Sequence, residues 1–176
     1  MTTTKWVLEP SHSDLQFKIR HLMISNVTGH FGKMEGTVET EGDDLSTAKV
    51  NMTIDVDSIN THNEQRDGHL KSPDFFDVAS HPKMIFESTS LQKENGENYK
   101  LHGHLTMHGM THPVALDIEF GGIGKDSYGN TRAGFGIEGK ITRKDWGLTY
   151  NGATEAGGLV LGEDVKISAN VEFVKA

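Results

Sequence analysis

Most of the chain alternates apolar and polar residues in short runs, which is the period of half-buried β-strands. Residues 14–21 show it clearly, because Leu15, Phe17 and Ile19 share one parity while polar residues take the other. After a short opening run at 6–8, similar runs follow at 26–40, 49–57, 84–91, 99–107, 114–120, 133–141 and 165–173. Turns of hairpin length join most of them and no helical crossover separates neighbours. The pattern therefore predicts an all-β protein built on an antiparallel sheet of eight main strands.

The run at 26–40 changes phase in its middle, because apolar residues occupy odd positions up to Phe31 and even positions from Met34. A β-bulge near Gly32 and Lys33 would restore the register, and bulges bend a sheet towards closure. The 20 glycines among 176 residues exceed the usual ~7 %, and several fall inside predicted strands. This favours a closed eight-stranded barrel over a sandwich. Such a barrel is either filled by its own side chains or holds one small ligand, and alternation alone leaves both open.

Residues 58–86 interrupt the alternation and predict the one helical segment, after the fourth strand when the opening run is counted. Thr61 with Glu64 three positions later has the form of a capping box. Ser72 followed by Pro73 repeats a helix-start signal. The helix between these two signals is very polar and contains one large apolar residue, Leu70.

A helix this polar is not core, so we expect it to form a strap across one end of the barrel. Leu70 and the adjacent pair Phe75 and Phe76 would then plug that end. On the same segment, His62, Arg66 and His69 have the i, i+4, i+7 spacing of one helix face. They would either contact a polar head group, with Arg66 suited to bidentate contact, or form a solvated face in which Arg66 pairs with an acid.

Charge and composition argue against several classes of binding partner. Lys plus Arg number 17 against 25 Asp plus Glu, a net charge of −8, which disfavours nucleic acid or an anionic membrane surface. The chain has no cysteine, so any metal would depend on histidine and carboxylates. No run approaches ~18 apolar residues and no leader precedes the first strand. We therefore expect a single domain over residues 1–176, located in the cytoplasm, with no membrane insertion.

Four stretches of the sequence, at 6–39, 54–89, 103–120 and 141–148, also carry a family resemblance. The most specific part combines Arg66-Asp67, His69-Leu70, Ser72-Pro73 and Phe75-Phe76-Asp77. The chain resembles the YceI-like family of polyisoprenoid-binding proteins from Trp6 nearly to its end. The resemblance implies a lipocalin-like antiparallel barrel whose interior tunnel holds an isoprenoid or another long-chain amphiphile. It also implies a homodimer in bacteria.

Two features depart from the family's pattern. Many relatives carry a leader for the periplasm, which this sequence lacks. Trp146 stands where phenylalanine is more usual, which implies a shortened or reshaped tunnel. Members do not all hold the same lipid, so the resemblance does not supply the ligand's identity.

Candidate ligand-binding residues follow from parity and from the resemblance. The apolar tunnel is expected to include Phe17, Ile19, Phe31, Leu70, Phe75, Phe76, Phe86, Leu105, Phe135 and Trp146. The polar head group is expected to meet His21, Arg66, His69 and Arg143. His21 shares the inward parity of Phe17, and Arg143 would either contact a ligand or pair with Asp145.

An enzymatic interpretation rests on the ten histidines. His102, His104, His108 and His112 lie within eleven residues, and neighbours of this kind are able to build a metal site. No carboxylate follows at a fixed short spacing, and His102 and His104 have the parity opposite to Leu101 and Leu105. Nucleophile-elbow, P-loop and dinucleotide motifs are absent from the sequence. We therefore expect no catalytic residue, no metal and no cofactor.

The sequence thus favours a non-enzymatic carrier of a long apolar molecule, with a role in stress response as one setting. The alternative is an all-β module with a filled core that acts through surface protein contacts. A histidine-based metal-dependent enzyme is the least favoured interpretation.

Overall fold

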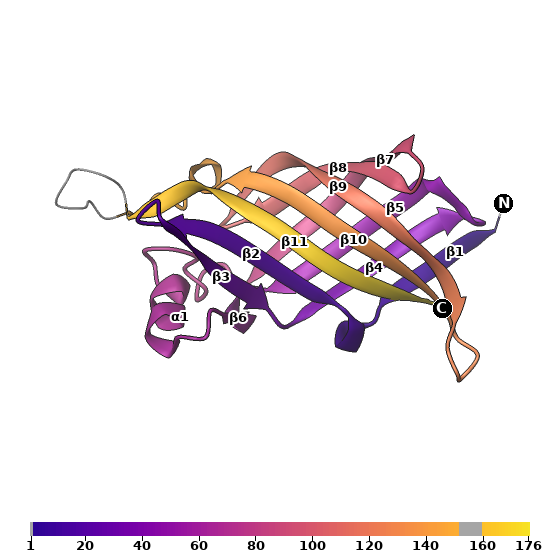
Figure 1. Ribbon diagram of the computed structural model, residues 1–176, viewed down its shortest axis with the longest axis horizontal. Helices are drawn as coiled ribbons and strands as arrows, with labels where there is room; N and C mark the ends of the chain where they lie inside the picture. The colour runs from indigo at the N-terminus through magenta and orange to yellow at the C-terminus, as the bar shows by residue number, and fades with distance from the viewer. Residues whose placement is uncertain (1, 152–159) are drawn as a thin grey trace.

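Pairing between the first and the last strand closes the sheet into a barrel (Figure 1). The structure is a computed structural model and describes residues 2–151 and 160–176. Its strands are β1 (Thr3–Leu8), β2 (Asp14–His21), β3 (Ser25–Phe31), β4 (Met34–Glu41), β5 (Asp44–Asp55), β6 (Ile59–Asn60), β7 (Lys83–Asn95), β8 (Asn98–Met107), β9 (Met110–Lys125), β10 (Thr131–Thr142) and β11 (Leu161–Lys175). The helix α1 (Glu64–Lys71) and three 3-10 turns, η1 (Pro10–His12), η2 (Val56–Ser58) and η3 (Arg143–Trp146), complete the described elements.

Eight strands form the closed ring, in the order β1-β4-β5-β7-β8-β9-β10-β11 and back to β1. All pairings are antiparallel, so the predicted eight-stranded antiparallel barrel is confirmed. The ring does not consist of the eight strands that were predicted, because it includes β1, the short opening run. Strand β2 instead pairs with the first part of β11, and β3 and β6 follow outward from β2.

The predicted bulge near Gly32 and Lys33 is wrong, because the run at 26–40 is two strands. Strand β3 pairs with β2, whereas β4 pairs with β1 and β5. Between them the backbone N–H groups of Gly32 and Lys33 donate to the carbonyl and the hydroxyl oxygen of Ser58, at 3.4 and 3.1 Å. The change of phase therefore marks a change of partner strands, after which a new set of side chains faces inward.

The two ends of the barrel differ. We call the helix end the one that carries α1, η3 and the turns at 21–25 and 107–110. The far end carries the turns at 41–44, 95–98 and 125–131. Figure 1 shows α1 beside β3 and β6 at the helix end, with the amino terminus at the opposite extreme.

The strap at the helix end has different caps from those predicted. Asn63 is the N-cap of α1, and its side chain accepts a hydrogen bond from the backbone N–H of Arg66 at 2.9 Å. Thr61 instead donates its hydroxyl and backbone N–H to Asp67. Ser72 ends the helix as its C-cap, so Pro73 begins a turn and no second helix. None of the described helices is long and apolar enough to cross a membrane.

Candidate ligand-binding site

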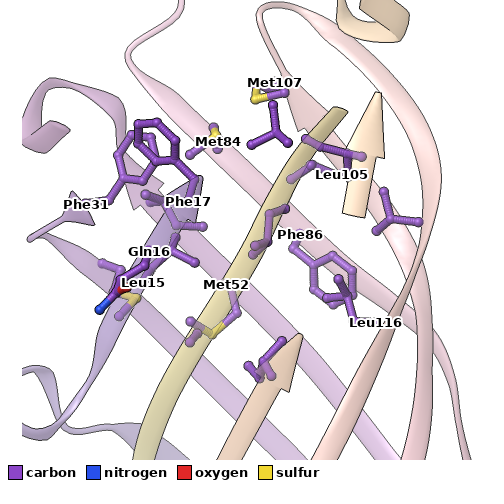
Figure 2. Close-up of a pocket in the computed structure, with 18 of the residues that line it drawn as sticks. Leu15, Gln16, Phe17, Phe31, Met52, Met84, Phe86, Leu105, Met107 and Leu116 are labelled. Carbon is purple, nitrogen blue, oxygen red and sulfur yellow. The ribbon is translucent and has the colours of Figure 1, made fainter. Parts of the chain in front are cut away.

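The inward faces of the strands enclose a cavity of about 580 Å³. Figure 2 shows lining side chains such as Phe17, Phe86 and Leu105 pointing from different strands into a common space. All but six of the lining residues are apolar, and the six polar ones are Gln16, His21, Arg66, His69, Arg143 and Tyr150. The cavity volume lies in the range of ~300–1,000 Å³ that is typical of ligand pockets, and an apolar wall with a few polar groups is their usual composition.

The cavity is long in one direction. Its lining residues on β11 extend from Leu161 to Phe173, which is about 40 Å of strand and about 30 Å along a barrel axis at the usual strand tilt. At the helix end the cavity reaches the surface, because its lining residue Tyr150 is 42 % exposed. Towards the far end the lining residues Leu101 and Phe173 are buried. We infer that the tunnel opens to the surface at the helix end, and we call this its open end.

Two glycines set the position of aromatic rings in the wall. Phe17 lies opposite Gly29 across the β2–β3 pair, and a Cβ on Gly29 would come within 2.2 Å of the Phe17 ring. The Phe86 ring covers Gly103 of the neighbouring strand β8, at 2.5 Å from the ideal Cβ position, although the residue directly opposite Gly103 is Ser88. A side chain at either glycine would push the ring further into the tunnel, so both glycines preserve its width.

The three predicted plug residues all line the cavity. Phe75 is 8 % exposed, and Leu70 and Phe76 are partly buried against the core. The Phe76 ring meets the Phe31 ring edge-on, with centroids 6.1 Å apart. The Phe75 ring contacts His69 and Tyr150 at 5.1 and 5.0 Å. The strap therefore presents apolar side chains to the tunnel together with two polar ones, Arg66 and His69.

Arg143 is the most deeply buried charge on the tunnel wall, with 5 % exposure. Its guanidinium donates to the carbonyls of Gly162, Leu148 and Tyr150 at 2.9, 2.6 and 2.8 Å. The predicted pair with Asp145 is absent, and no carboxylate within the described ranges lies at ion-pair distance from Arg143. Burial lowers the pKa of the guanidinium, and the Glu163 charge opposes that shift. An arginine remains protonated in proteins, so the tunnel wall carries a positive charge here.

Three further polar residues of the lining are Arg66, His69 and His21. Arg66 donates through Nε and Nη2 to the hydroxyl and carbonyl oxygens of Thr61, at 2.8 and 2.7 Å. The partner of Arg66 is therefore Thr61 and not the acidic residue that the sequence suggested. His69 pairs with Asp74 at 2.8 Å. His21 is half-buried and pairs in register with Leu161 near the open end.

The expected helix stripe is incomplete, because His62 precedes α1 and packs its ring against His30. Thirteen of the fourteen residues proposed from sequence line the cavity, and Trp146 is the exception. Its indole is 2 % exposed, donates from Nε1 to the Leu105 carbonyl at 2.9 Å and packs edge-on against His112. Trp146 lies on a 3-10 turn, where the period of the preceding strand no longer fixes which way a side chain points.

Sequence reasoning missed Tyr150 and four methionines of the wall. Tyr150 follows η3 outside any strand, so no periodicity marks it. The methionines were detectable, because they take inward parity on their strands, and their unbranched side chains suit an adaptable wall. These residues are Met34, Met52, Met84 and Met107.

The histidine cluster does not lie on the tunnel. His102 and His104 are absent from the cavity wall, which β8 lines through Leu101, Leu105 and Met107. His108 donates from Nδ1 to the Trp146 carbonyl, at 2.9 Å. Within residues 2–151 and 160–176, no group of three or more histidines and carboxylates is placed to hold a metal ion.

Comparison with known proteins agrees with this architecture. The sequence profile of the YceI-like domain matches residues 6–173. A UPF0312 protein of Staphylococcus aureus (strain N315) is 41 % identical over 171 residues, which is 97 % of each chain. A UPF0312 protein of Staphylococcus epidermidis (strain ATCC 35984) is 42 % identical over the same length and share.

Solved structures share the barrel. The YCEI protein of Campylobacter jejuni is 33 % identical, with a TM-score of 0.77 over 90 % of this chain and 91 % of that one. BcnA of Burkholderia cenocepacia superposes with a TM-score of 0.81 at 19 % identity, over 94 % and 98 % of the two chains. A polyisoprenoid binding domain from Saccharophagus degradans gives 0.71 at 18 % identity, over 97 % and 98 %. At such low identity these last two show the fold alone.

Proposed function

The chain belongs to the family of proteins with a YceI-like domain, and from this premise we propose that it binds one long, apolar, amphiphilic molecule inside its barrel. The observation that carries the proposal is the tunnel itself, with an apolar wall and its polar residues gathered mainly at the open end. One structural neighbour, from Saccharophagus degradans, is a polyisoprenoid binding domain. An isoprenoid chain is therefore the first candidate for the occupant.

The energetics favour an occupant over an unfilled tunnel. At about 24 cal/mol per Å³ of apolar cavity, a volume of 580 Å³ corresponds to about 14 kcal/mol. This is an upper limit because water enters the open end, but it matches the whole stability of a typical domain, ~5–15 kcal/mol. A chain that buries about 400 Å² of apolar area would gain about 10 kcal/mol, of which association costs remove a large part.

The ligand's orientation follows from the polar groups. An apolar tail extends towards the far end, between strands that supply leucine, methionine and phenylalanine. The head group stays at the helix end, near Arg143, Arg66, His69 and His21. Among the described residues, the guanidinium groups of Arg66 and Arg143 bond to Thr61 and to backbone carbonyls and have no carboxylate at ion-pair distance. They therefore suit an oxygen-rich head group such as a phosphate or a carboxylate.

The other interpretations fit the cavity less well. A module with a filled core would have its inward side chains in contact across the barrel, whereas here they enclose 580 Å³. Catalysis would need an activated group facing the tunnel. The homodimer, which rests on the resemblance, and the cytoplasmic location expected from the sequence stay proposals. Light scattering tests the first and cell fractionation the second.

Titration with prenyl alcohols, prenyl phosphates and fatty acids of increasing length tests the proposal. We expect saturable binding of one molecule per chain, with a melting temperature that rises with ligand concentration. Affinity should increase with chain length until the tunnel is filled. A protein that binds none of these compounds, and whose melting temperature none of them changes, would refute the proposal.

A further inference from the structure

The turn between β2 and β3 exposes three consecutive large apolar side chains. Leu22 is 40 % exposed, Met23 57 % and Ile24 77 %. We call these three residues the apolar tip. Single exposed apolar residues are ordinary on protein surfaces, but three in succession at the end of a projecting hairpin are not.

The backbone of the apolar tip is also unfavourable for its residues. Leu22 and Met23 have φ angles of +52° and +58°, in the left-handed region that favours glycine or asparagine. Hairpin turns of this kind are most stable with Asn-Gly. Leucine and methionine therefore lower both the solubility of the protein and the stability of this turn. Residues that are unfavourable in this way are often found at functional positions.

The apolar tip adjoins the open end of the tunnel. The backbone N–H of Leu22 donates to the carbonyl of Val160 at 2.7 Å, and Val160 lines the cavity. His21, immediately before the tip, lines the cavity as well. In Figure 1 the β2–β3 hairpin lies at the same end of the barrel as α1. A molecule that leaves the tunnel emerges beside these three side chains.

The turns at the two ends differ in charge. The far-end turns at 41–44, 95–98 and 125–131 contain five acidic residues and one lysine. The helix-end turns at 21–25 and 107–110 contain no acidic residue, and the acids of that end lie on α1 and η3, at Glu64, Asp67 and Asp145. Arg20 lies at the base of the tip and donates to the Met23 carbonyl at 2.7 Å. The net charge of −8 therefore does not repel an anionic surface evenly, and the helix-end turns oppose its approach least.

We propose that the apolar tip inserts shallowly into a lipid bilayer surface and places the open end of the tunnel against it, so that the ligand passes between membrane and barrel. This inference rests on the proposed function. Only the side chains of one turn enter the boundary between head groups and acyl chains, and no segment spans the membrane. Tyr150, 42 % exposed on the tunnel wall, has the amphipathic ring that is enriched at such boundaries.

A lipid surface fits the tip better than a protein partner does. Three side chains on one turn offer far less area than the ~800 Å² per partner of a standard protein interface. A narrow projecting tip also lacks the flat self-complementary patch that a two-fold dimer requires. A bilayer requires no complementary shape, and it is where long apolar amphiphiles reside.

The test uses two variants of the tip and one control. Met23→Ser with Ile24→Ser removes apolar area, and Leu22→Asn with Met23→Gly installs the favoured turn sequence. Ile123→Ser is the matched control, because Ile123 is 55 % exposed at the far end. Each protein is sedimented with phosphatidylcholine vesicles, with and without phosphatidylglycerol. A fluorescent long-chain fatty acid serves as the probe, and its transfer from donor vesicles to protein is followed in time.

We expect each tip variant to lower vesicle partitioning by about tenfold or more, and Ile123→Ser to leave it unchanged. Transfer to the unmodified protein should speed up with vesicle concentration, as direct contact requires, and this dependence should vanish in the tip variants. The Leu22→Asn, Met23→Gly variant should keep or raise the melting temperature, which separates lost contact from misfolding. Equal partitioning of all four proteins would overturn the inference.

Two further outcomes are informative. Unchanged vesicle binding together with a smaller sedimenting species in the tip variants would assign the tip to contact with a second copy of the chain and overturn the inference. Binding of the probe in vesicle-free solution tests the proposed function separately. Probe binding that is normal without vesicles, combined with transfer independent of vesicle concentration in every protein, would refute the membrane contact and leave the carrier function standing.

Discussion

Replacing Ala169 with phenylalanine tests whether the barrel interior is still a tunnel about two thirds of the way in from the helix end. Ala169 lies on β11 between Ile137 of β10 and Leu15 of β2, is 7 % exposed and lines the cavity. In a packed core, such an enlargement costs about 1–3 kcal/mol of unfolding free energy. In a tunnel, the new ring instead fills space and gains up to about 1.5–3 kcal/mol from burial. The sign of the change distinguishes the two situations.

Ala133 supplies the matched control. It is 4 % exposed on β10 and is absent from the cavity wall. Ala133→Phe should therefore lose stability, while Ala169→Phe should keep or gain it. Urea denaturation monitored by tryptophan fluorescence gives both free energies, with unchanged m-values as the check for a comparable unfolding transition.

The same substitution shortens the tunnel. Leu161 and Ala169 are eight residues apart on β11, or about 26 Å along the strand and about 20 Å along the barrel axis. Ala169→Phe should thus retain short-chain ligands and lose most affinity for chains longer than about 20 Å. Equal destabilisation by the Ala169 and Ala133 substitutions, with unaltered preference for chain length, would refute a tunnel at this position.

Three further predictions concern the strap and the far end. Phe76→Ala should lower the unfolding free energy of the ligand-free protein by less than the ~3–5 kcal/mol of a core phenylalanine, because Phe76 is only partly buried, and should speed ligand dissociation measured by stopped-flow fluorescence. Arg66→Ala should lower the unfolding free energy by about 1 kcal/mol, because its hydrogen bonds to Thr61 are lost. In calorimetric titration it should lower the affinity for prenyl phosphates more than for prenyl alcohols. Equal losses of affinity for both ligands would exclude a head-group contact. Hydrogen bonding to Arg132, at 2.8 Å, lowers the pKa of Asp126. Asp126→Asn should therefore lower the melting temperature at pH 7. The difference from the unmodified protein should shrink as the pH falls below about 4, the pKa of the carboxyl in the unfolded chain.

Local patterns were sufficient to predict the strands and the inward side chains. The period of two placed Phe17, Phe86 and Phe135 on the inner face, and the structure puts them on the cavity wall. The short polar helix was detectable because it interrupts that period. Each of these inferences depends on residues close together in the chain, and the sequence reports such neighbours directly.

Features that depend on distant partners were less accessible. The split of residues 26–40 into β3 and β4 reflects which strand each half pairs with. Asn63 rather than Thr61 caps α1, because Asp67 holds Thr61. Trp146 lies off the tunnel because the Leu105 carbonyl of another strand accepts its indole N–H. Whether inward side chains meet across the barrel depends on strand number and tilt, which no single strand encodes.

Mass spectrometry of the protein as isolated from its own cells, without added lipid or detergent, shows directly whether the tunnel is occupied. Gentle ionisation should show a discrete mass increment of one molecule per chain. Extraction with organic solvent should remove that increment and return a single class of long-chain apolar amphiphile. Ala169→Phe protein, prepared in parallel, should carry less of it or a shorter homologue. Repeated preparations whose folded mass equals that of the bare chain, and whose extracts contain no such compound, would contradict the account.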